Sequence, residues 1–380
     1  MSKTEEKQSY YTKAYEILPA PSFNGELYTP ETSLLDVIKD KTLRATNALG
    51  YPEEQQKSML QLIEDIWGKY SHYRVGEPPF HSFGAKEGTP VEFQLCWDNK
   101  GPSFRFGSDS YAFNPISLAF DPSPGSSKAE FYKTTRKISN YEGVDCDDSI
   151  AMEKYFQSVG TFGVGGHVVQ WRKGGKPSFK IYFINRPDEE HNLESALKHL
   201  NVIEPWEAIK AHFKKMGLSK PQCGALSLDM KDSKISRVKL YVAHEGHSAK
   251  VIDETSSIAS NYKAGAFEKA LKVITGKSSN WENPPVTYFS FFPGEKVPSA
   301  SLIFIPLIPN LENDAMVMER CREFLEEEDT NQKEYVKGYV EAFQAFSHKP
   351  LEKSKTLNFL AYIPGKQFSL NIGPGIFDSI

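Results

Sequence analysis

The sequence predicts an α/β barrel of ten antiparallel strands, built from five ααββ repeats and surrounded by an outer ring of helices. Pairs of strand-like runs recur along the 380 residues, and a pair of helix-like runs precedes each of them. Ten antiparallel strands in an open sheet would leave two unpaired edges, and closing the sheet into a barrel removes both. A barrel of this size is wide enough to enclose a chamber.

The strand-like runs predict five hairpins, because apolar residues alternate in them and Gly, Pro, Asn, Asp or Lys residues form the turns. The hairpins are expected at 89–108, 161–185, 223–243, 285–307 and 355–373. In most of the helix-like runs apolar residues recur every three or four positions. Helices are expected at 33–49, 53–70, 128–138, 147–157, 193–200, 205–217, 256–265, 267–276, 314–328 and 332–346. We expect an irregular N-terminal segment at 1–34 and a single barrel domain at 35–380.

Composition and charge exclude several classes of protein. The formal net charge is −4, whereas a non-specific nucleic-acid binder is usually basic. The four cysteines are isolated and have no zinc-site spacing, which is typical of a reducing compartment, so we expect a cytoplasmic protein. The N-terminus lacks the apolar segment of a secretory signal, and the most apolar run, 302–308, is too short to span a membrane.

Basic residues and tyrosines share one face of the expected strands. They are Arg105, Lys180 with Tyr182, and Arg237 and Lys239 with Tyr241. Because strand residues alternate between two faces, the opposite faces are apolar and would pack against the helices. The basic residues then point into the chamber, where buried cations need an anionic partner such as a diphosphate. The alternative is that these residues form the solvated outer face of an antiparallel sheet.

Two further features have alternative interpretations. Aromatic residues make up 13% of the chain, which fits either a packed β core or an aromatic chamber that holds a cation. The glycine-rich run 162–167 begins a strand and does not open a helix, so dinucleotide binding is not expected. We expect its glycines to permit a bulge or a close approach of two backbones inside the barrel.

Four segments resemble the dimethylallyltryptophan synthase family of aromatic prenyltransferases. They are TPVEFQLCW at 89–97, SFRF at 103–106, FKIYF at 179–183 and ALSLDMKDSKISRVKLYV at 225–242. The length is similar to that of the shorter, bacterial-type members. The resemblance implies an ABBA-type prenyltransferase barrel that transfers a dimethylallyl or geranyl group from its diphosphate to an indole ring. The implied acceptor is tryptophan or a tryptophan-derived secondary metabolite, such as an indole alkaloid, an indolactam or a cyclic peptide.

The resemblance also implies roles for individual residues. Glu92 would accept a hydrogen bond from the indole N–H, and Lys180 is our candidate for removing the ring proton. The implied diphosphate ligands are Arg105, Lys180, Arg237 and Lys239, and Tyr182 and Tyr241 would screen the allylic cation. We expect Trp97, Phe304 and Tyr362 to line the acceptor or prenyl pocket. We expect no metal, no other cofactor, no nucleic-acid or membrane partner, and a monomer or weak homodimer.

Two other functions remain open at this stage. A metal-dependent isoprenoid synthase would be all-helical and would need clustered carboxylates to hold magnesium. The nearest such group is Asp145, Asp147 and Asp148, which is more typical of a helix N-terminus. A non-catalytic barrel that binds a hydrophobic ligand is the other alternative, although it would not need four inward-facing cations.

Overall fold

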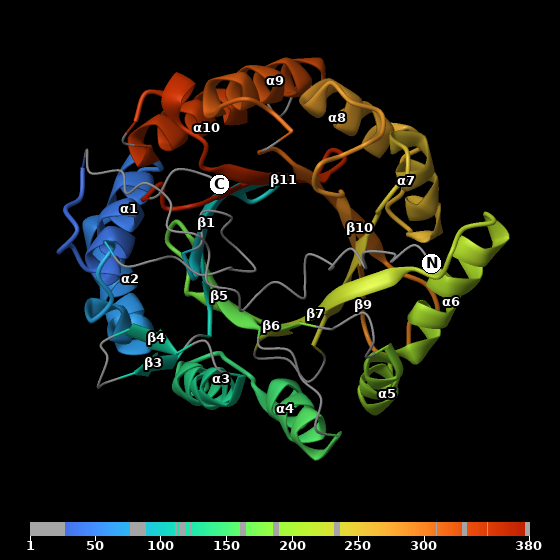
Figure 1. Ribbon diagram of the computed structural model, residues 1–380, viewed down its shortest axis with the longest axis horizontal. Coiled ribbons are helices and arrows are strands. Elements are labelled where there is room, and N and C mark those ends of the chain that lie inside the picture. Colours follow the sequence, from blue (N-terminus) through green and yellow to red (C-terminus); the bar gives the residue numbers. More distant parts are fainter. Residues whose placement is uncertain are drawn as a thin grey trace, which may run out of the picture.

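The chain folds into a closed barrel inside a ring of helices. The computed structural model describes residues 27–76, 89–110, 112–114, 119–121, 124–159, 165–184, 190–231, 236–308, 310–328, 333–347 and 349–376. The barrel strands pair antiparallel in the order β1-β12-β11-β10-β9-β8-β7-β6-β5-β2, and β2 pairs with β1 to close it. The helices lie around the barrel (Figure 1), and no strand of the barrel has a free edge. This confirms the predicted fold.

Consecutive elements follow the predicted ααββ order. The barrel strands are β1 Val91–Asp98, β2 Gly101–Asp109, β5 Gly166–Arg172, β6 Ser178–Ile184, β7 Gln222–Met230, β8 Val238–Ala243, β9 Val286–Phe291, β10 Ala300–Pro306, β11 Leu357–Ile363 and β12 Gln367–Ile372. The helices are α1 Leu34–Ala48, α2 Glu53–Trp67, α3 Pro124–Ile138, α4 Asp147–Val159, α5 Glu190–His199, α6 Ile203–Lys215, α7 Ala249–Thr255, α8 Ala266–Thr275, α9 Asp314–Glu327 and α10 Lys333–Phe346. Parts of the predicted elements at 161–164, 185, 232–235 and 332, and residues 1–26 of the N-terminal segment, lie outside the described residues.

Two local differences separate the prediction from the structure. The α-helix expected at 256–265 does not form there. The helix is α7, which ends at Thr255, and Ser248 caps its start by accepting a hydrogen bond from the Val251 N–H. The Asp253 carboxylate then accepts hydrogen bonds from the N–H groups of Gly265 and Phe267, each at 2.8 Å, so the chain turns back there and begins α8. A short hairpin of β3 (Ala112–Asn114) and β4 (Ala119–Asp121) lies outside the barrel and was not predicted.

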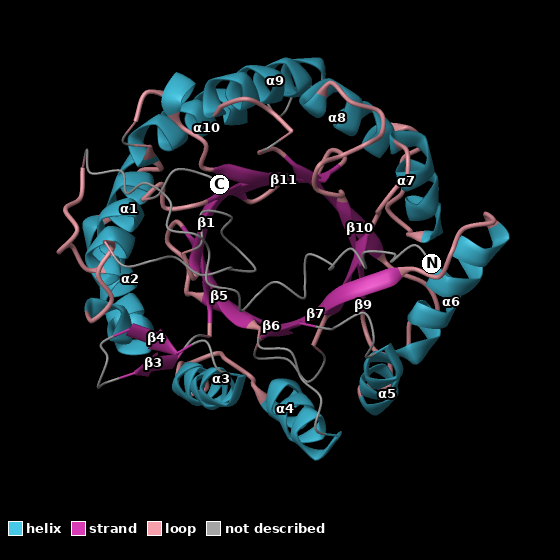
Figure 2. Ribbon diagram, in the orientation of Figure 1, coloured by secondary structure: helices cyan, strands magenta, loops and turns pink. Residues whose placement is uncertain are grey.

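Figure 2 shows the helices in a ring around the strands of the barrel, and buried hydrophobic side chains from both form the core. The outward faces of β1 and β2 supply Phe93, Phe104 and Phe106, which are fully buried. The ring of Phe106 packs edge-on against Trp67 of α2, with 4.8 Å between the ring centroids. At the junction of the first and last helices, Lys41 donates a hydrogen bond of 2.8 Å from α1 to the Phe346 carbonyl of α10. The core therefore leaves the inner faces of the strands to line the chamber.

Two glycines allow the strands to come close at the start of β5. A Cβ atom on Gly165 would lie 1.6 Å from the Tyr182 carbonyl oxygen, and one on Gly166 would lie 2.5 Å from the Ser108 carbonyl oxygen. Any side chain at these positions would force two backbones apart. The structure therefore shows the close backbone approach that the glycine-rich run predicts.

Candidate active site

The predicted basic residues lie on the inner face of the barrel around one acid, Asp229 of β7. The Asp229 carboxylate forms ion pairs with Lys239 Nζ at 2.5 Å and with Arg237 Nη2 at 2.8 Å. Lys180 on β6 stands directly opposite Asp229 in the strand register. Only 2% of the Lys239 side chain and 5% of the Asp229 side chain are exposed. These residues therefore do not form a solvated outer face.

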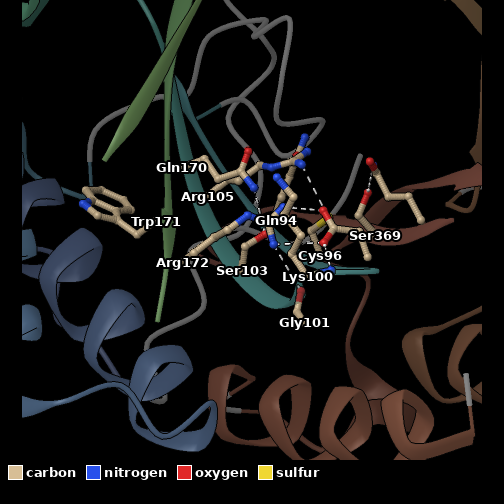
Figure 3. A network of polar contacts seen from close by, with 12 residues as sticks. Gln94, Cys96, Lys100, Gly101, Ser103, Arg105, Gln170, Trp171, Arg172 and Ser369 are labelled. Carbon is tan, nitrogen blue, oxygen red and sulfur yellow. Dashed lines mark hydrogen bonds and ion pairs between the residues drawn. The ribbon is translucent and has the colours of Figure 1, made fainter. Parts of the chain in front are cut away.

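Arg105 completes this cluster from β2. Its Nη1 donates to Gln94 Oε1 at 3.0 Å and its Nη2 donates to the Cys96 sulfur at 3.4 Å. Figure 3 shows Arg105 beside Gln94 and Cys96, with Gln170 of β5 nearby. Arg105 is 9% exposed, and its Nε has no hydrogen-bond partner among the described residues. A buried guanidinium N–H without an acceptor is costly, and an oxygen-rich anion would satisfy it.

Burial and crowding change the pKa values of the basic residues. Burial lowers the pKa of Lys239 to about 8, although Asp229 partly opposes this effect. Burial, together with repulsion from Arg105 and Lys239, holds the pKa of Lys180 well below its usual value. Burial alone would raise the pKa of Asp229, but the attraction of Lys239, Lys180 and Arg237 outweighs it and lowers this pKa. The chamber therefore favours a multiply charged anion, which would restore the charged form of both lysines.

Glu92 of β1 lies in a pocket of the same chamber. Its Oε1 accepts hydrogen bonds from Asn371 Nδ2 of β12 at 2.8 Å and from Gln94 Nε2 at 3.2 Å. Burial raises the pKa of Glu92 to about 8, and the hydrogen bonds from Gln94 and Asn371 limit this rise. Because Oε1 is occupied by these amides, Oε2 is the oxygen that can accept a further hydrogen bond from a ligand.

Aromatic side chains line the chamber beside Glu92. The Tyr182 and Tyr241 rings lie 5.8 Å apart, and Tyr241 also packs against Tyr288 and Phe304 at 5.7 and 5.8 Å. Tyr182, Tyr241 and Phe304 line the same pocket as Glu92 and Gln94. Burial raises the pKa of Tyr182, Tyr241 and Tyr288, so these phenols stay neutral. Their ring faces are suited to a carbocation in a space with little water.

Two of the expected pocket residues lie elsewhere. Trp97 packs edge-on against Tyr339 of α10 at 5.1 Å, because strand alternation sends it to the face opposite Glu92. Tyr362 donates a hydrogen bond of 2.7 Å to Glu328 at the end of α9 and packs against Phe324. Both residues therefore belong to the core between the barrel and the helices, and we no longer assign them to the pocket.

Tyr288 and Asn371 belong to the chamber but were not predicted from the sequence. Tyr288 of β9 stands opposite Tyr241 in the register, and Asn371 of β12 contacts Glu92. The available signal was strand alternation. Tyr288 shares a face with Ser290 in VTYFSF, and Asn371 shares a face with Ser369 and Gln367 in QFSLNI. Each is a polar stripe on a strand whose other face is apolar.

Comparison with known proteins connects this site to a family. Residues 165–342 match the family model described as tryptophan dimethylallyltransferase. Among solved structures, the chain is similar to 6-dimethylallyltryptophan synthase from Micromonospora olivasterospora in complex with DMASPP and Trp, with a TM-score of 0.79, 17% identity, and 92% of this chain and 99% of that chain covered. It is also similar to 5-dimethylallyltryptophan synthase from Streptomyces coelicolor, with a TM-score of 0.75, 18% identity, and 90% and 98% covered.

A third solved structure, of the prenyltransferase PriB without ligand, has a TM-score of 0.78 at 19% identity and covers 92% of this chain and 98% of that chain. At these identities the structural matches establish the fold. With the family match they confirm the resemblance to dimethylallyltryptophan synthases that the sequence indicated.

Among the described residues, no group of three or more His, Cys, Asp or Glu side chains is placed to hold a metal ion. No described helix is long and apolar enough to cross a membrane.

Proposed function

We propose that this member of the dimethylallyltryptophan synthase family transfers a prenyl group from its diphosphate to the indole ring of tryptophan or of a tryptophan-derived metabolite. The observation that carries the proposal is the arrangement of the chamber. Arg237 and Lys239 form ion pairs with Asp229, Lys180 stands opposite it, and the charge of Arg105 acts on Lys180. Tyr182 and Tyr241 line the same chamber as Glu92. An ionising allylic diphosphate needs both a site for the anion that leaves and a site for the cation that forms.

The reaction begins as the basic cluster binds the diphosphate of the donor. The allylic C–O bond breaks, its electron pair leaves with the diphosphate, and the cluster stabilises the charge that develops there. Tyr182 and Tyr241 present their ring faces to the allylic cation and keep water from it. In this scheme the cationic side chains supply the charge that magnesium supplies in other isoprenoid enzymes.

Glu92 orients the acceptor. Its carboxylate accepts a hydrogen bond from the indole N–H, which increases the electron density of the ring. A ring carbon then forms the new C–C bond with the allylic cation, and the resulting arenium ion loses a proton from that carbon. Lys180 is our candidate base. The bound diphosphate favours its charged form, so Lys180 first gives a proton to the departing diphosphate and then takes up the ring proton, and burial, which lowers its pKa, favours that first loss.

The finer assignments belong to the same proposal. The donor is a dimethylallyl or geranyl diphosphate, and no metal or other cofactor takes part. We place the enzyme in the cytoplasm, in keeping with the four cysteines, which are free and buried. The closed β barrel argues against an all-helical metal-dependent synthase.

The test is turnover of dimethylallyl and geranyl diphosphate with a panel of indoles, in excess EDTA, with products identified by mass spectrometry. Prenylated indole that forms in EDTA supports the proposal. Product that forms only after magnesium is restored would refute the metal-free mechanism. Binding of both ligands without product under either condition would favour the non-catalytic barrel.

A further inference from the structure

We propose that Gln94 is a positioning residue that connects the two halves of the reaction, because one amide holds both the diphosphate-binding Arg105 and the acceptor-binding Glu92. The inference rests on the proposed function and deepens it. Gln94 lies on the inner face of β1, two residues after Glu92 and directly opposite Arg105 in the strand register. Its side chain therefore lies between the two groups.

The hydrogen bonds fix the orientation of this amide. A guanidinium group can only donate hydrogen bonds, so the atom of Gln94 that faces Arg105 at 3.0 Å must be its oxygen. The nitrogen of Gln94 then faces Glu92 Oε1, at 3.2 Å, and donates to it. Glu92 Oε1 is therefore always an acceptor, and only Oε2 can carry a proton. Arg105, through Gln94, acts together with Asn371, which donates to the same oxygen at 2.8 Å, to leave Oε2 as the oxygen available to the indole N–H.

The same contact orients Arg105 for the donor. With Nη1 on Gln94 and Nη2 on Cys96, the guanidinium keeps its buried Nε without a partner among the described residues. This N–H, together with the second N–H of Nη1 and that of Nη2, can donate to diphosphate oxygens. Loss of Gln94 would release Nη1, so that the orientation of the guanidinium is no longer fixed by this hydrogen bond.

The charge state of Glu92 depends on the same residue. The hydrogen bond from Gln94 favours the carboxylate, because an N–H donor stabilises the charged form. Several other charged and titratable groups face Glu92 or line its pocket. They are Arg105 and Asp109 of β2, His167 of β5, Tyr182 of β6, Tyr241 of β8, and Glu245 after β8. Of these groups only Arg105 forms a hydrogen bond with Gln94, so the pKa shift that a substitution at Gln94 causes reports the lost hydrogen bond to Glu92 together with the release of Arg105.

The experiment compares Gln94→Met with Gln170→Met. Gln170 is a matched control, because it also faces the chamber, stands opposite Arg105 on the other side of β2, and donates to Ser103 without touching Glu92. The first measurement is the pH dependence of kcat/KM for the indole acceptor at saturating donor. Its acidic limb should move to higher pH by about one unit in Gln94→Met, since a hydrogen bond to a charged group is lost. In Gln170→Met the limb should not move.

The second measurement is the affinity for inorganic pyrophosphate, measured by calorimetry, which needs no turnover. Gln94→Met should bind pyrophosphate about tenfold more weakly than the wild type, because Arg105 is no longer held. Gln170→Met should bind it as the wild type does. If the wild type transfers no prenyl group but Gln94→Met alone loses pyrophosphate affinity, the proposed function fails and the link to Arg105 stands. Equal pyrophosphate affinities in the two variants, or an unmoved acidic limb in Gln94→Met, would refute the proposed connection.

Discussion

Asp229 is the acid around which the basic residues of the chamber gather, and its conversion to asparagine removes one charge with little change in shape. The side chain forms ion pairs with Lys239 and Arg237, and Lys239 is almost completely buried. Removing one partner of a buried ion pair costs about 3–5 kcal/mol, because the other charge stays buried without an opposite charge. We therefore expect Asp229→Asn to fold but to be less stable by about this amount.

This loss corresponds to a measurable change in melting temperature. A protein of 380 residues has an unfolding entropy of about 0.8 kcal/mol per kelvin at its melting temperature, so the variant should melt about 4–6 °C lower. The basic residues lower the pKa of Asp229 in the folded protein. Its contribution to stability is therefore present above the unfolded-state pKa of about 4 and is lost as the pH falls. The difference in melting temperature between the wild type and Asp229→Asn should accordingly begin to decrease below about pH 4.

Inorganic pyrophosphate distinguishes this role from a purely structural one. Asp229→Asn makes the chamber more positive, so pyrophosphate should bind at least about tenfold more tightly and raise the melting temperature more than in the wild type. Asp253→Asn is the matched control. Asp253 is equally buried but caps α8 outside the chamber. This variant should therefore be less stable than the wild type, but pyrophosphate should raise its melting temperature by the same amount as that of the wild type.

Thermal melts by circular dichroism, with and without saturating pyrophosphate, provide both readouts. An Asp229→Asn variant that melts within about one degree of the wild type would contradict the buried-pair argument. Equal stabilisation of the Asp229→Asn and Asp253→Asn variants by pyrophosphate would show that Asp229 does not border the anion site.

Three further outcomes are expected. Glu92→Gln should lower kcat at least about a hundredfold with unchanged pyrophosphate affinity. In denaturant titrations at pH 9 it should be more stable than the wild type by up to about 5 kcal/mol, because burial raises the pKa of Glu92 from 4.5 to about 8 and the wild type loses stability as the pH rises from the lower value through the higher one. Lys239→Ala should weaken pyrophosphate binding about tenfold or more. The pKa of Lys239 is about 8, so the wild type should bind pyrophosphate more weakly above that pH, and calorimetry at several pH values should show that the variant lacks this decrease. Tyr362→Phe loses its hydrogen bond to Glu328 and should cost about 1 kcal/mol of stability with unchanged kcat and KM; altered kinetics would return Tyr362 to the pocket.

The fold could be predicted because its signals are local. Strand alternation and turn residues belong to single hairpins, and the barrel follows from the need to pair two sheet edges. The error at 256–265 has a physical reason that the helical pattern does not contain. Asp253, several residues earlier, accepts hydrogen bonds from the backbone at Gly265 and Phe267, and these contacts favour a turn over a continuous helix.

The site could be predicted only where one strand contained the information. Alternation alone placed Arg105, Lys180 and Lys239 on inward faces, and it would have placed Trp97 outside. Asn371 could not be assigned to Glu92 in this way, because the two residues are 279 positions apart and meet only when β12 closes the barrel against β1. Contacts of this kind depend on which strands become neighbours, which no single strand determines.

The buried ionisable groups of the chamber are electrostatically unfavourable on their own, which is a physical reason to expect that they bind ligands. Burial favours the neutral form of Glu92 and the neutral form of Lys180, so both groups are shifted away from their usual charges. A diphosphate beside Lys180 and an N–H donor beside Glu92 would each favour the charged form again. A barrel needed only for stability would fill these positions with apolar residues, as it does on its outer face. The two substrates supply the interactions that the chamber lacks, and each does so at the group assigned to it.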